Sequence, residues 1–156
     1  MDLKQLYQDI ILEHGKSPRN FGRCKKHTHE AKGYNPLCGD KVQIFLNLNK
    51  EKKVENLTFE GSGCAISMAS TSIMTELVKG KSLEATKKIV FDFLDMIKNT
   101  QEIKSEELDE DQKTTIMSLS GVKQYPMRVK CATLGWHTLN SAMLEKKEEV
   151  NTEVID

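Results

Sequence analysis

The sequence predicts a single α+β domain, α/β in the broad sense, in which a small antiparallel sheet packs with helices. Apolar residues have helical spacing near the start, alternate with period two in the middle, and return to helical spacing after residue 64. Strands that follow one another through short turns form an antiparallel meander. A chain of 156 residues, 38% of them hydrophobic, can bury about 70% of its extended surface, which is enough for one core.

The first element expected is an amphipathic helix, because apolar residues recur three or four positions apart until the stretch ends near Pro18. A polar, loop-like segment then continues to about Glu30. A strand candidate lies near Ala31 to Asn35. Alternating apolar residues predict a second strand over residues 41–48, and a slightly less regular pattern predicts a third over residues 54–59.

The pattern becomes helical again after Cys64. One helix should run from Ile66 to Leu77 and stop near Gly80, where glycine favours a helix end. A second should follow, with Ser82 as its cap and apolar residues up to Ile97. A last helix should follow Pro126 and carry apolar residues up to Met143.

Two charged segments interrupt these elements. Residues 101–113 contain six acidic residues, two lysines and few apolar residues, a composition typical of a solvated loop or helix face. The chain is charged again from Glu145 onward. We therefore expect residues 1–145 to form the domain and residues 146–156 to form a charged, disordered tail.

Composition and charge argue against several classes of function. The formal charge is zero, with 23 basic and 23 acidic side chains, so nothing indicates a nucleic-acid or anionic-membrane partner. No apolar stretch approaches twenty residues and no signal peptide follows Met1. These features predict a cytoplasmic protein whose four cysteines are reduced thiols.

Three cysteines lie in settings unlike ordinary core positions. Cys38, Cys64 and Cys131 each lie beside loop residues at the end of an expected element. With Asp40 they supply three thiols and a carboxylate, enough for a tetrahedral metal site or for thiol-based sulfur chemistry. Two simpler interpretations stay open: a lone cysteine is often a small buried hydrophobe, and Asp40 can be a turn residue.

The expected placement of these residues favours thiolates. Cys64 and Cys131 should lie in the first turn of a helix, where unpaired N–H groups and the helix dipole stabilise a negative charge. Cys38 should lie on a loop, and Asp40, two positions later, can face the same ion in an extended segment. The Gly61-Ser62-Gly63 segment should allow a close approach of backbone to that site.

Other polar side chains lie near these cysteines or form clusters of their own. Cys24, His27 and His29 could bind a metal, but their polar surroundings favour a solvent-exposed cluster. His137 is expected to pack or to support a ligand, because it lies about two helical turns beyond the third cysteine. Arg128 could hold an anionic persulfide or lower a nearby thiol pKa, or be an ordinary surface arginine.

Four segments together carry a resemblance to a known family. The segments are His14-Gly15-Lys16-Ser17-Pro18-Arg19-Asn20, Asn35-Pro36-Leu37-Cys38-Gly39-Asp40, Gly61-Ser62-Gly63-Cys64-Ala65-Ile66 and Arg128-Val129-Lys130-Cys131-Ala132. They resemble the NifU N-terminal/IscU family of iron–sulfur cluster assembly proteins. Lys130 stands where IscU proteins have a histidine, and the acidic segment from Gln101 resembles an insertion of the SufU branch. The Leu-Pro-Pro-Val-Lys motif of IscU, read by a dedicated chaperone, is missing. The chain is thus most similar to the SufU branch.

The resemblance implies a three-stranded antiparallel sheet covered by helices and a Zn²⁺ ion held by Cys38, Asp40, Cys64 and Cys131. It further implies a sulfurtransferase in which Cys38 accepts persulfide sulfur from a pyridoxal-phosphate-dependent cysteine desulfurase and passes it to downstream iron–sulfur assembly proteins. An alternative is a scaffold on which a [2Fe–2S] cluster is built on the same four groups, because thiolates suit iron as well as zinc. A structural zinc module is a third possibility.

Overall fold

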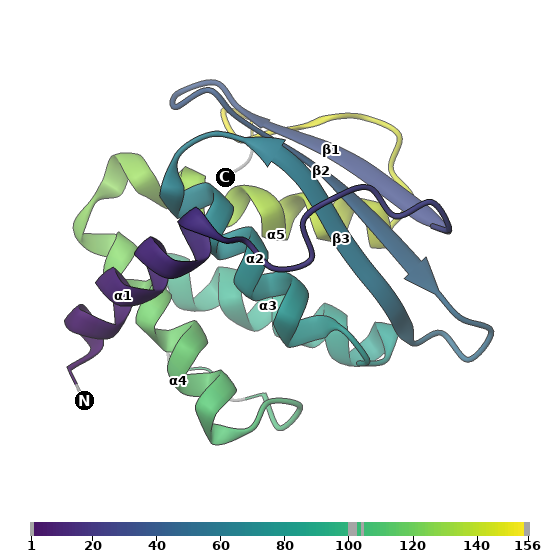
Figure 1. Ribbon diagram of the computed structural model, residues 1–156, viewed down its shortest axis with the longest axis horizontal. Coiled ribbons are helices and arrows are strands. Elements are labelled where there is room, and N and C mark those ends of the chain that lie inside the picture. Colours follow the sequence, from purple (N-terminus) through teal and green to yellow (C-terminus); the bar gives the residue numbers. More distant parts are fainter. Residues whose placement is uncertain (1, 100–102, 104, 155–156) are drawn as a thin grey trace.

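The computed structural model describes residues 2–99, 103 and 105–154 (Figure 1). The elements found in this part of the chain are, in order, α1 (Leu3–Lys16), β1 (His29–Asn35), β2 (Asp40–Leu48), β3 (Val54–Ser62), α2 (Ala65–Val78), α3 (Leu83–Lys98), α4 (Glu110–Ser118), the 3-10 helices η1 (Leu119–Gln124) and η2 (Pro126–Arg128), α5 (Val129–Met143) and β4 (Val150–Asn151). The predicted α+β class and the antiparallel meander are confirmed.

The sheet has the strand order β3-β2-β1-β4. The first three strands pair antiparallel, as predicted, whereas β4 runs parallel to β1. This fourth strand corrects the expectation of a three-stranded sheet and of a wholly disordered tail over residues 146–156, of which 155 and 156 lie outside the described residues. Charge composition predicted disorder here, and a two-residue strand leaves no periodic signal. The segment is nevertheless ordered, because Thr152 is buried and its N–H donates to the Tyr34 carbonyl.

One face of the sheet is covered by α2 and α5, and α1 and α3 pack outside these two helices (Figure 1). The centre of this layer is Trp136, whose ring stacks on Phe93 with 4.0 Å between centroids. The indole N–H donates to the Ser70 hydroxyl, which donates to the Ala132 carbonyl. These two hydrogen bonds pair buried polar groups and join α5 to α2.

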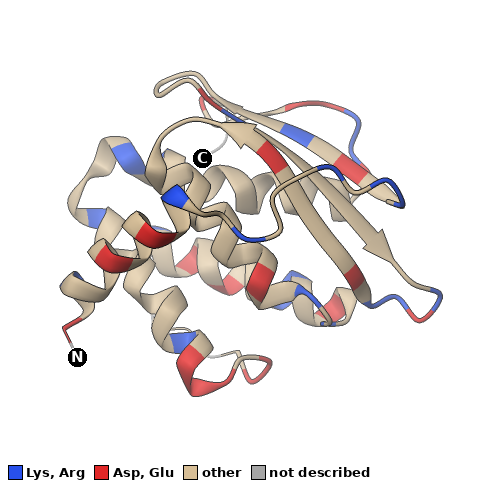
Figure 2. Ribbon diagram, in the orientation of Figure 1, with Lys and Arg blue, Asp and Glu red and all other residues tan. Residues whose placement is uncertain are grey.

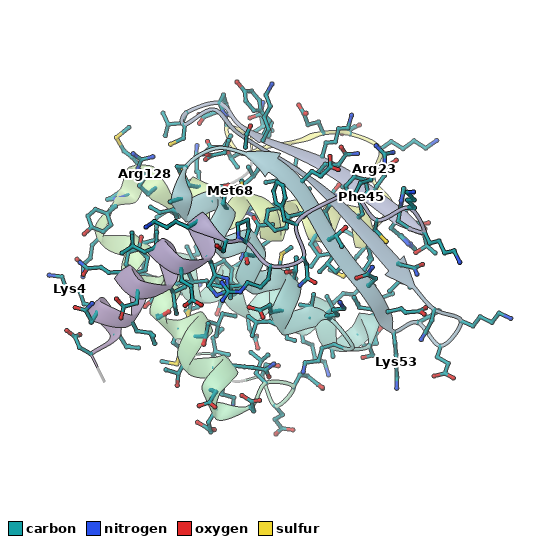
Figure 3. The ribbon with its side chains drawn as sticks, in the orientation of Figure 1. Lys4, Arg23, Phe45, Lys53, Met68 and Arg128 are labelled. Carbon is teal, nitrogen blue, oxygen red and sulfur yellow. The ribbon has the colours of Figure 1, made fainter. Side chains whose placement is uncertain are left out.

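The other face of the sheet is partly covered by the segment between α1 and β1. Phe45 is fully buried there, with the His27 ring 5.2 Å from its centroid and the Arg23 guanidinium 5.3 Å away (Figure 3). The same segment extends along β3, where Gly22 N–H donates to the Phe59 carbonyl. The expected polar loop thus follows the sheet closely.

The acidic segment that begins at Gln101 contains a helix. Residues 101, 102 and 104 lie outside the described part, but α4 begins within the run, and Asp109 and Gln112 close a reciprocal capping box at its start. Leu108 and Ile116 from this region are buried.

Basic and acidic side chains are interspersed over helices and strands (Figure 2). In the described residues, no helix combines the length and the apolar character that crossing a membrane requires.

Candidate metal centre

Three connections meet at one end of the sheet (Figure 1). Cys38 lies on the turn between β1 and β2, and Asp40 is the first residue of β2. Cys64 is the N-cap residue of α2, and Cys131 lies in the first turn of α5. Arg128, directly before α5, lies at the same end (Figure 3). Residues as far apart in the sequence as Cys38 and Cys131 therefore lie at the same end of the sheet.

The side chains of Cys38, Asp40 and Cys131 converge there. Each offers one ligand atom, and these three atoms all lie within 4.8 Å of one another. The Sγ atoms of Cys38 and Cys131 are 3.1 Å apart. Asp40 and Cys131 are fully buried, whereas Cys38 is partly exposed. Two thiols and a carboxylate at this spacing suit zinc, whose sites use sulfur, nitrogen and carboxylate oxygen ligands.

Cys64 lies next to this cluster without belonging to the set that converges within 4.8 Å. Hydrogen bonding with the Cys131 thiol lowers the pKa of Cys64 to about 7, and the backbone N–H groups of Ser67 and Ile66 add to this effect. Burial and the Asp40 carboxylate oppose it. The Cys131 hydrogen bond, with a smaller contribution from the N–H groups at the start of α2, thus favours a Cys64 thiolate.

Cys131 behaves differently from the expectation. Its pKa is raised, first because its thiol donates a hydrogen bond to Cys64 and then because the thiol is buried. Contacts with Cys38 and Asp40 raise it further. A helix start therefore does not by itself lower the pKa of Cys131, because its hydrogen bond to Cys64, burial and the contacts with Cys38 and Asp40 all raise it. A bound metal cation would reverse this balance.

Asp40 is held by two N–H donors. The backbone N–H of Cys64 donates to Oδ1 at 2.8 Å, and the Asn35 side-chain amide donates to Oδ2 at 3.0 Å. The carboxylate is buried within a strand, so the turn-residue interpretation does not fit. Each oxygen still has a free lone pair, which leaves the carboxylate able to bind an ion while remaining fixed.

Gly63 makes this arrangement possible. Its φ of +149° is a conformation that other residues rarely adopt, and a Cβ at this position would lie 2.3 Å from Asp40 Oδ1. Gly61 is also constrained, because its Cβ would lie 2.3 Å from the Lys41 carbonyl oxygen. The close approach predicted for the glycine segment is therefore present, and it places the start of α2 against the carboxylate.

Two cations flank the cluster. Arg128 is exposed, yet its guanidinium donates to the Cys38 sulfur at 3.4 Å, so it is more than an ordinary surface arginine. Lys130 points elsewhere and donates to Glu153 at 3.2 Å. Cys38 is therefore the thiol of this centre that has both solvent access and a permanent positive charge beside it.

The cluster of Cys24, His27 and His29 does not converge on one point. The Cys24 thiol donates to the Lys26 carbonyl at 3.2 Å, and His27 Nδ1 lies 2.8 Å from the Cys24 carbonyl. His29 lies 3.5 Å from Glu145. Among the described residues, the groups that could hold a metal are those around Cys38.

His137 lies on α5 away from the ligand atoms, beside Val129 and Thr133 in a small groove. Burial lowers its pKa, which fits the predicted packing role. The His14–Asn20 segment is also structural: Ser72 Oγ accepts the Arg19 backbone N–H and lies 2.8 Å from His14 Nδ1. This segment joins the end of α1 to α2.

Sequence analysis missed two residues of the centre. The first is the Asn35 side chain, which appeared only as part of a motif, although it donates to both Asp40 and Cys131. The second is Thr152, whose hydroxyl donates to Asn35 Oδ1 at 2.9 Å from a segment expected to be disordered. No periodicity marks either role. The position of Asn35 at the end of a strand candidate was the one available signal.

Comparison with known proteins agrees with this geometry. The model of the NifU-like N terminal domain matches residues 6–145. The chain belongs to the NifU N-terminal family. Among relatives of this family, the zinc-dependent sulfurtransferase SufU of Bacillus subtilis is 36% identical over 146 residues, which are 94% of this chain and 95% of that protein.

Scaffold proteins of the family are similar as well. The iron–sulfur cluster assembly scaffold protein IscU of Streptococcus pyogenes is 34% identical, over 90% of this chain and 84% of that protein. A crystal structure of a candidate scaffold of the SUF system from Fervidobacterium islandicum superposes with a TM-score of 0.77 and 32% identity, covering 89% of this chain and 97% of the other. The resemblance inferred from the four motifs is thereby confirmed.

Proposed function

We propose that this protein acts in iron–sulfur cluster biogenesis as a zinc-dependent sulfurtransferase. In this role Cys38 accepts sulfur from the persulfide of a cysteine desulfurase and passes it to a downstream assembly protein. The observation that carries the proposal is the setting of Cys38: a partly exposed thiol on a turn, 3.4 Å from the Arg128 guanidinium and beside a convergent ligand set. Similarity to SufU supports the same role.

The zinc ion would be held by Cys38, Asp40, Cys64 and Cys131, a donor set of three sulfurs and one oxygen that suits a tetrahedral site. Bound zinc supplies a positive charge that keeps the thiols deprotonated at neutral pH. Without it, hydrogen bonding to Cys64 and burial raise the pKa of the Cys131 thiol. Asn35 and the Cys64 N–H hold the Asp40 carboxylate in place at the same time.

Sulfur transfer follows the chemistry of thiol–disulfide exchange. The Cys38 thiolate attacks the outer sulfur of the desulfurase persulfide, a new S–S bond forms on Cys38, and the old S–S bond breaks. The desulfurase cysteine leaves as a thiolate, so electrons and atoms balance. Arg128 stabilises the anionic persulfide on Cys38 through its charge and its N–H donors.

A scaffold function is the second candidate, because the same four groups can hold an iron–sulfur cluster as cargo and IscU scaffolds are similar to this chain. The two functions predict different proteins after purification without oxygen. The sulfurtransferase should be colourless and carry about one zinc ion per chain. Brown protein with stoichiometric iron and sulfide would favour the scaffold.

The direct test replaces Cys38 by serine. With a partner desulfurase, cysteine and mild reductant, the parent protein should raise turnover, because it removes the persulfide and regenerates the enzyme nucleophile. Cys38→Ser should abolish the gain, since a hydroxyl forms no stable persulfide and carries almost no anion near neutral pH. Alanine production by the desulfurase measures turnover.

The matched control is Cys24→Ser, which removes a thiol outside the ligand cluster. It should stimulate the desulfurase like the parent protein. Mass spectrometry of the stalled reaction should find the added sulfur on Cys38. Full stimulation by Cys38→Ser, or sulfur mainly on Cys24, would contradict sulfur transfer through Cys38.

A further inference from the structure

The C-terminal strand reaches the metal centre from outside the region matched by the family model, which ends at residue 145. In β4, Val150 lies beside Gly33 and Asn151 lies beside Tyr34. The next residue, Thr152, donates its backbone N–H to the Tyr34 carbonyl at 3.1 Å and has an exposed fraction of only 2%. Strand pairing therefore buries the Thr152 side chain next to the end of β1.

That side chain holds the Asn35 amide on the side away from the ligand atoms. The Thr152 hydroxyl donates to Asn35 Oδ1 at 2.9 Å, while Asn35 Nδ2 donates to Asp40 Oδ2 at 3.0 Å and to Cys131 Sγ at 3.4 Å. An amide has its acceptor on one side and its two donors on the other. The bond to Thr152 thus satisfies Oδ1 while Nδ2 faces the ligand atoms.

The opposite orientation of this amide would be costly. It would place Asn35 Oδ1 against the Asp40 carboxylate, and Asn35 and Asp40 are both fully buried. Buried acceptors without donors are strongly unfavourable. The Asp40 carboxylate therefore sets the orientation of the amide, and Thr152 holds its far side by supplying the donor that the buried Oδ1 needs.

A second contact joins the same segment to the centre. Glu153 accepts a hydrogen bond from Lys130 at 3.2 Å, directly before Cys131 in the sequence. Both side chains are partly exposed, so this ion pair contributes little stability. The Thr152 hydroxyl, which is buried, is the stronger of the two connections.

We propose that Thr152 is a positioning residue of the metal centre, and that the C-terminal strand controls how firmly zinc is retained there. The hydroxyl holds Asn35, and Asn35 holds Asp40 and Cys131. This inference rests on the proposed zinc-dependent function. Residues that orient metal ligands in this way typically change metal affinity by about 10–100-fold when replaced.

The test measures zinc release to a chromophoric chelator from the full-length, zinc-loaded protein. Thr152→Val keeps the shape of the side chain and removes the hydroxyl, so release should become roughly tenfold or more faster. Thr152→Ser keeps a hydroxyl and should restore slow release. The matched control is Thr86→Val, which removes a buried hydroxyl from α3 whose bond goes to the Ser82 carbonyl.

Two results would overturn the proposal. One is parent-like zinc release from Thr152→Val. The other is equal acceleration in Thr152→Val and Thr86→Val, because that would indicate general destabilisation. A parent protein that carries no zinc would instead contradict the proposed function, so the two failures are distinguishable.

A second measurement needs no variant. Coupling between two sites is reciprocal, so zinc must stabilise the C-terminal strand if the strand stabilises zinc. The Thr152 amide, which donates to Tyr34, should exchange its hydrogen more slowly in zinc-loaded protein than in protein stripped by chelator. Equal exchange in both forms, with other amides near the centre protected by zinc, would contradict the coupling.

Discussion

Two clusters of cysteine and polar residues occupy different parts of this molecule, and only one has the geometry of a metal centre. Cys24, His27 and His29 lie within six positions of one another in the sequence. Cys38 and Cys131 are 93 positions apart, yet their sulfur atoms are 3.1 Å apart. In Figure 3, Arg128 marks the end with the metal centre, and Arg23 and Phe45 mark the region of the other cluster.

The difference lies in where the polar atoms point. In the first cluster they are paired separately: Cys24 with Lys26 and Asn56, and His27 with the Cys24 carbonyl. In the metal centre the ligand atoms of Cys38, Asp40 and Cys131 face one another. The residues of the first cluster are close in sequence, but their polar atoms do not face one another. In the metal centre, the ends of strands and the starts of helices bring residues that are far apart in sequence together.

The largest effect that separates the two clusters should come from removing a buried ligand. Cys131→Ser should lose zinc and lower the free energy of unfolding by more than about 4 kcal/mol, because binding energy at such a site is folding energy. For a chain of this size that corresponds to a melting temperature roughly 8–16 °C lower. Zinc content and thermal unfolding measure both.

Cys24→Ser is the counterpart in the other cluster. Its thiol makes hydrogen bonds to Lys26 and Asn56 that a hydroxyl can also make, so zinc content should stay at the parent value. Loss of zinc from Cys24→Ser, or full zinc in Cys131→Ser, would reverse the assignment of the two clusters.

Alanine substitutions at two glycines, one in each region, should have a smaller effect. Gly63 and Gly22 have φ values of +149° and +132°, so alanine strains the backbone at both positions, by about 1–3 kcal/mol. Only at Gly63 does the added Cβ also meet Asp40 Oδ1; at Gly22 nothing lies within 4 Å. Gly63→Ala should therefore release zinc faster in the chelator assay, and Gly22→Ala should not.

Equal rates of zinc release from the two glycine variants would mean that the close approach of Gly63 to Asp40 does not affect zinc retention. Thermal unfolding of both variants serves as the control, since backbone strain alone should lower their stability by similar amounts. The comparison therefore separates the effect of strain from the effect of moving the carboxylate.

Much of this architecture could be predicted from sequence, because it depends on local pattern. The alternation in β2 and the helical spacing in α2, α3 and α5 gave those elements near their observed bounds. Residue type and place at element ends predicted Cys38, Asp40, Cys64 and Cys131 as ligands, and the structure brings Cys38, Asp40 and Cys131 together. Charge composition concealed α4 and β4, because the few buried contacts that order them, such as those of Ile116 and Thr152, are tertiary.

The chemistry within the site was harder to predict. A helix start predicted a low pKa for both Cys64 and Cys131, but it is lowered for one and raised for the other. Adjacent thiols share a proton, and the sharing depends on distances that no sequence pattern contains. The chain Thr152–Asn35–Asp40 has the same character, since it joins residues 117 positions apart.

The smallest predicted effect concerns His14, a buried histidine that contrasts with the partly exposed His27 and His29. Burial lowers its pKa, and the nearby Arg19 lowers it further, against a smaller opposing effect of Glu76. In the unfolded chain the pKa of a histidine is about 6.5. Between the folded and unfolded pKa values the unfolded state binds more protons, so stability rises with pH in that window.

Stability should therefore decline as the pH falls below about 6.5, and His14→Gln should weaken that decline, because glutamine has no proton to gain and can still hydrogen-bond Ser72. The measurement is the difference in free energy of unfolding between parent and variant from pH 7.5 down to pH 5. Proton release linked to zinc binding affects both proteins alike and cancels in this difference. A difference that stays constant over the whole range would show that the buried imidazole is not what makes the fold sensitive to acid.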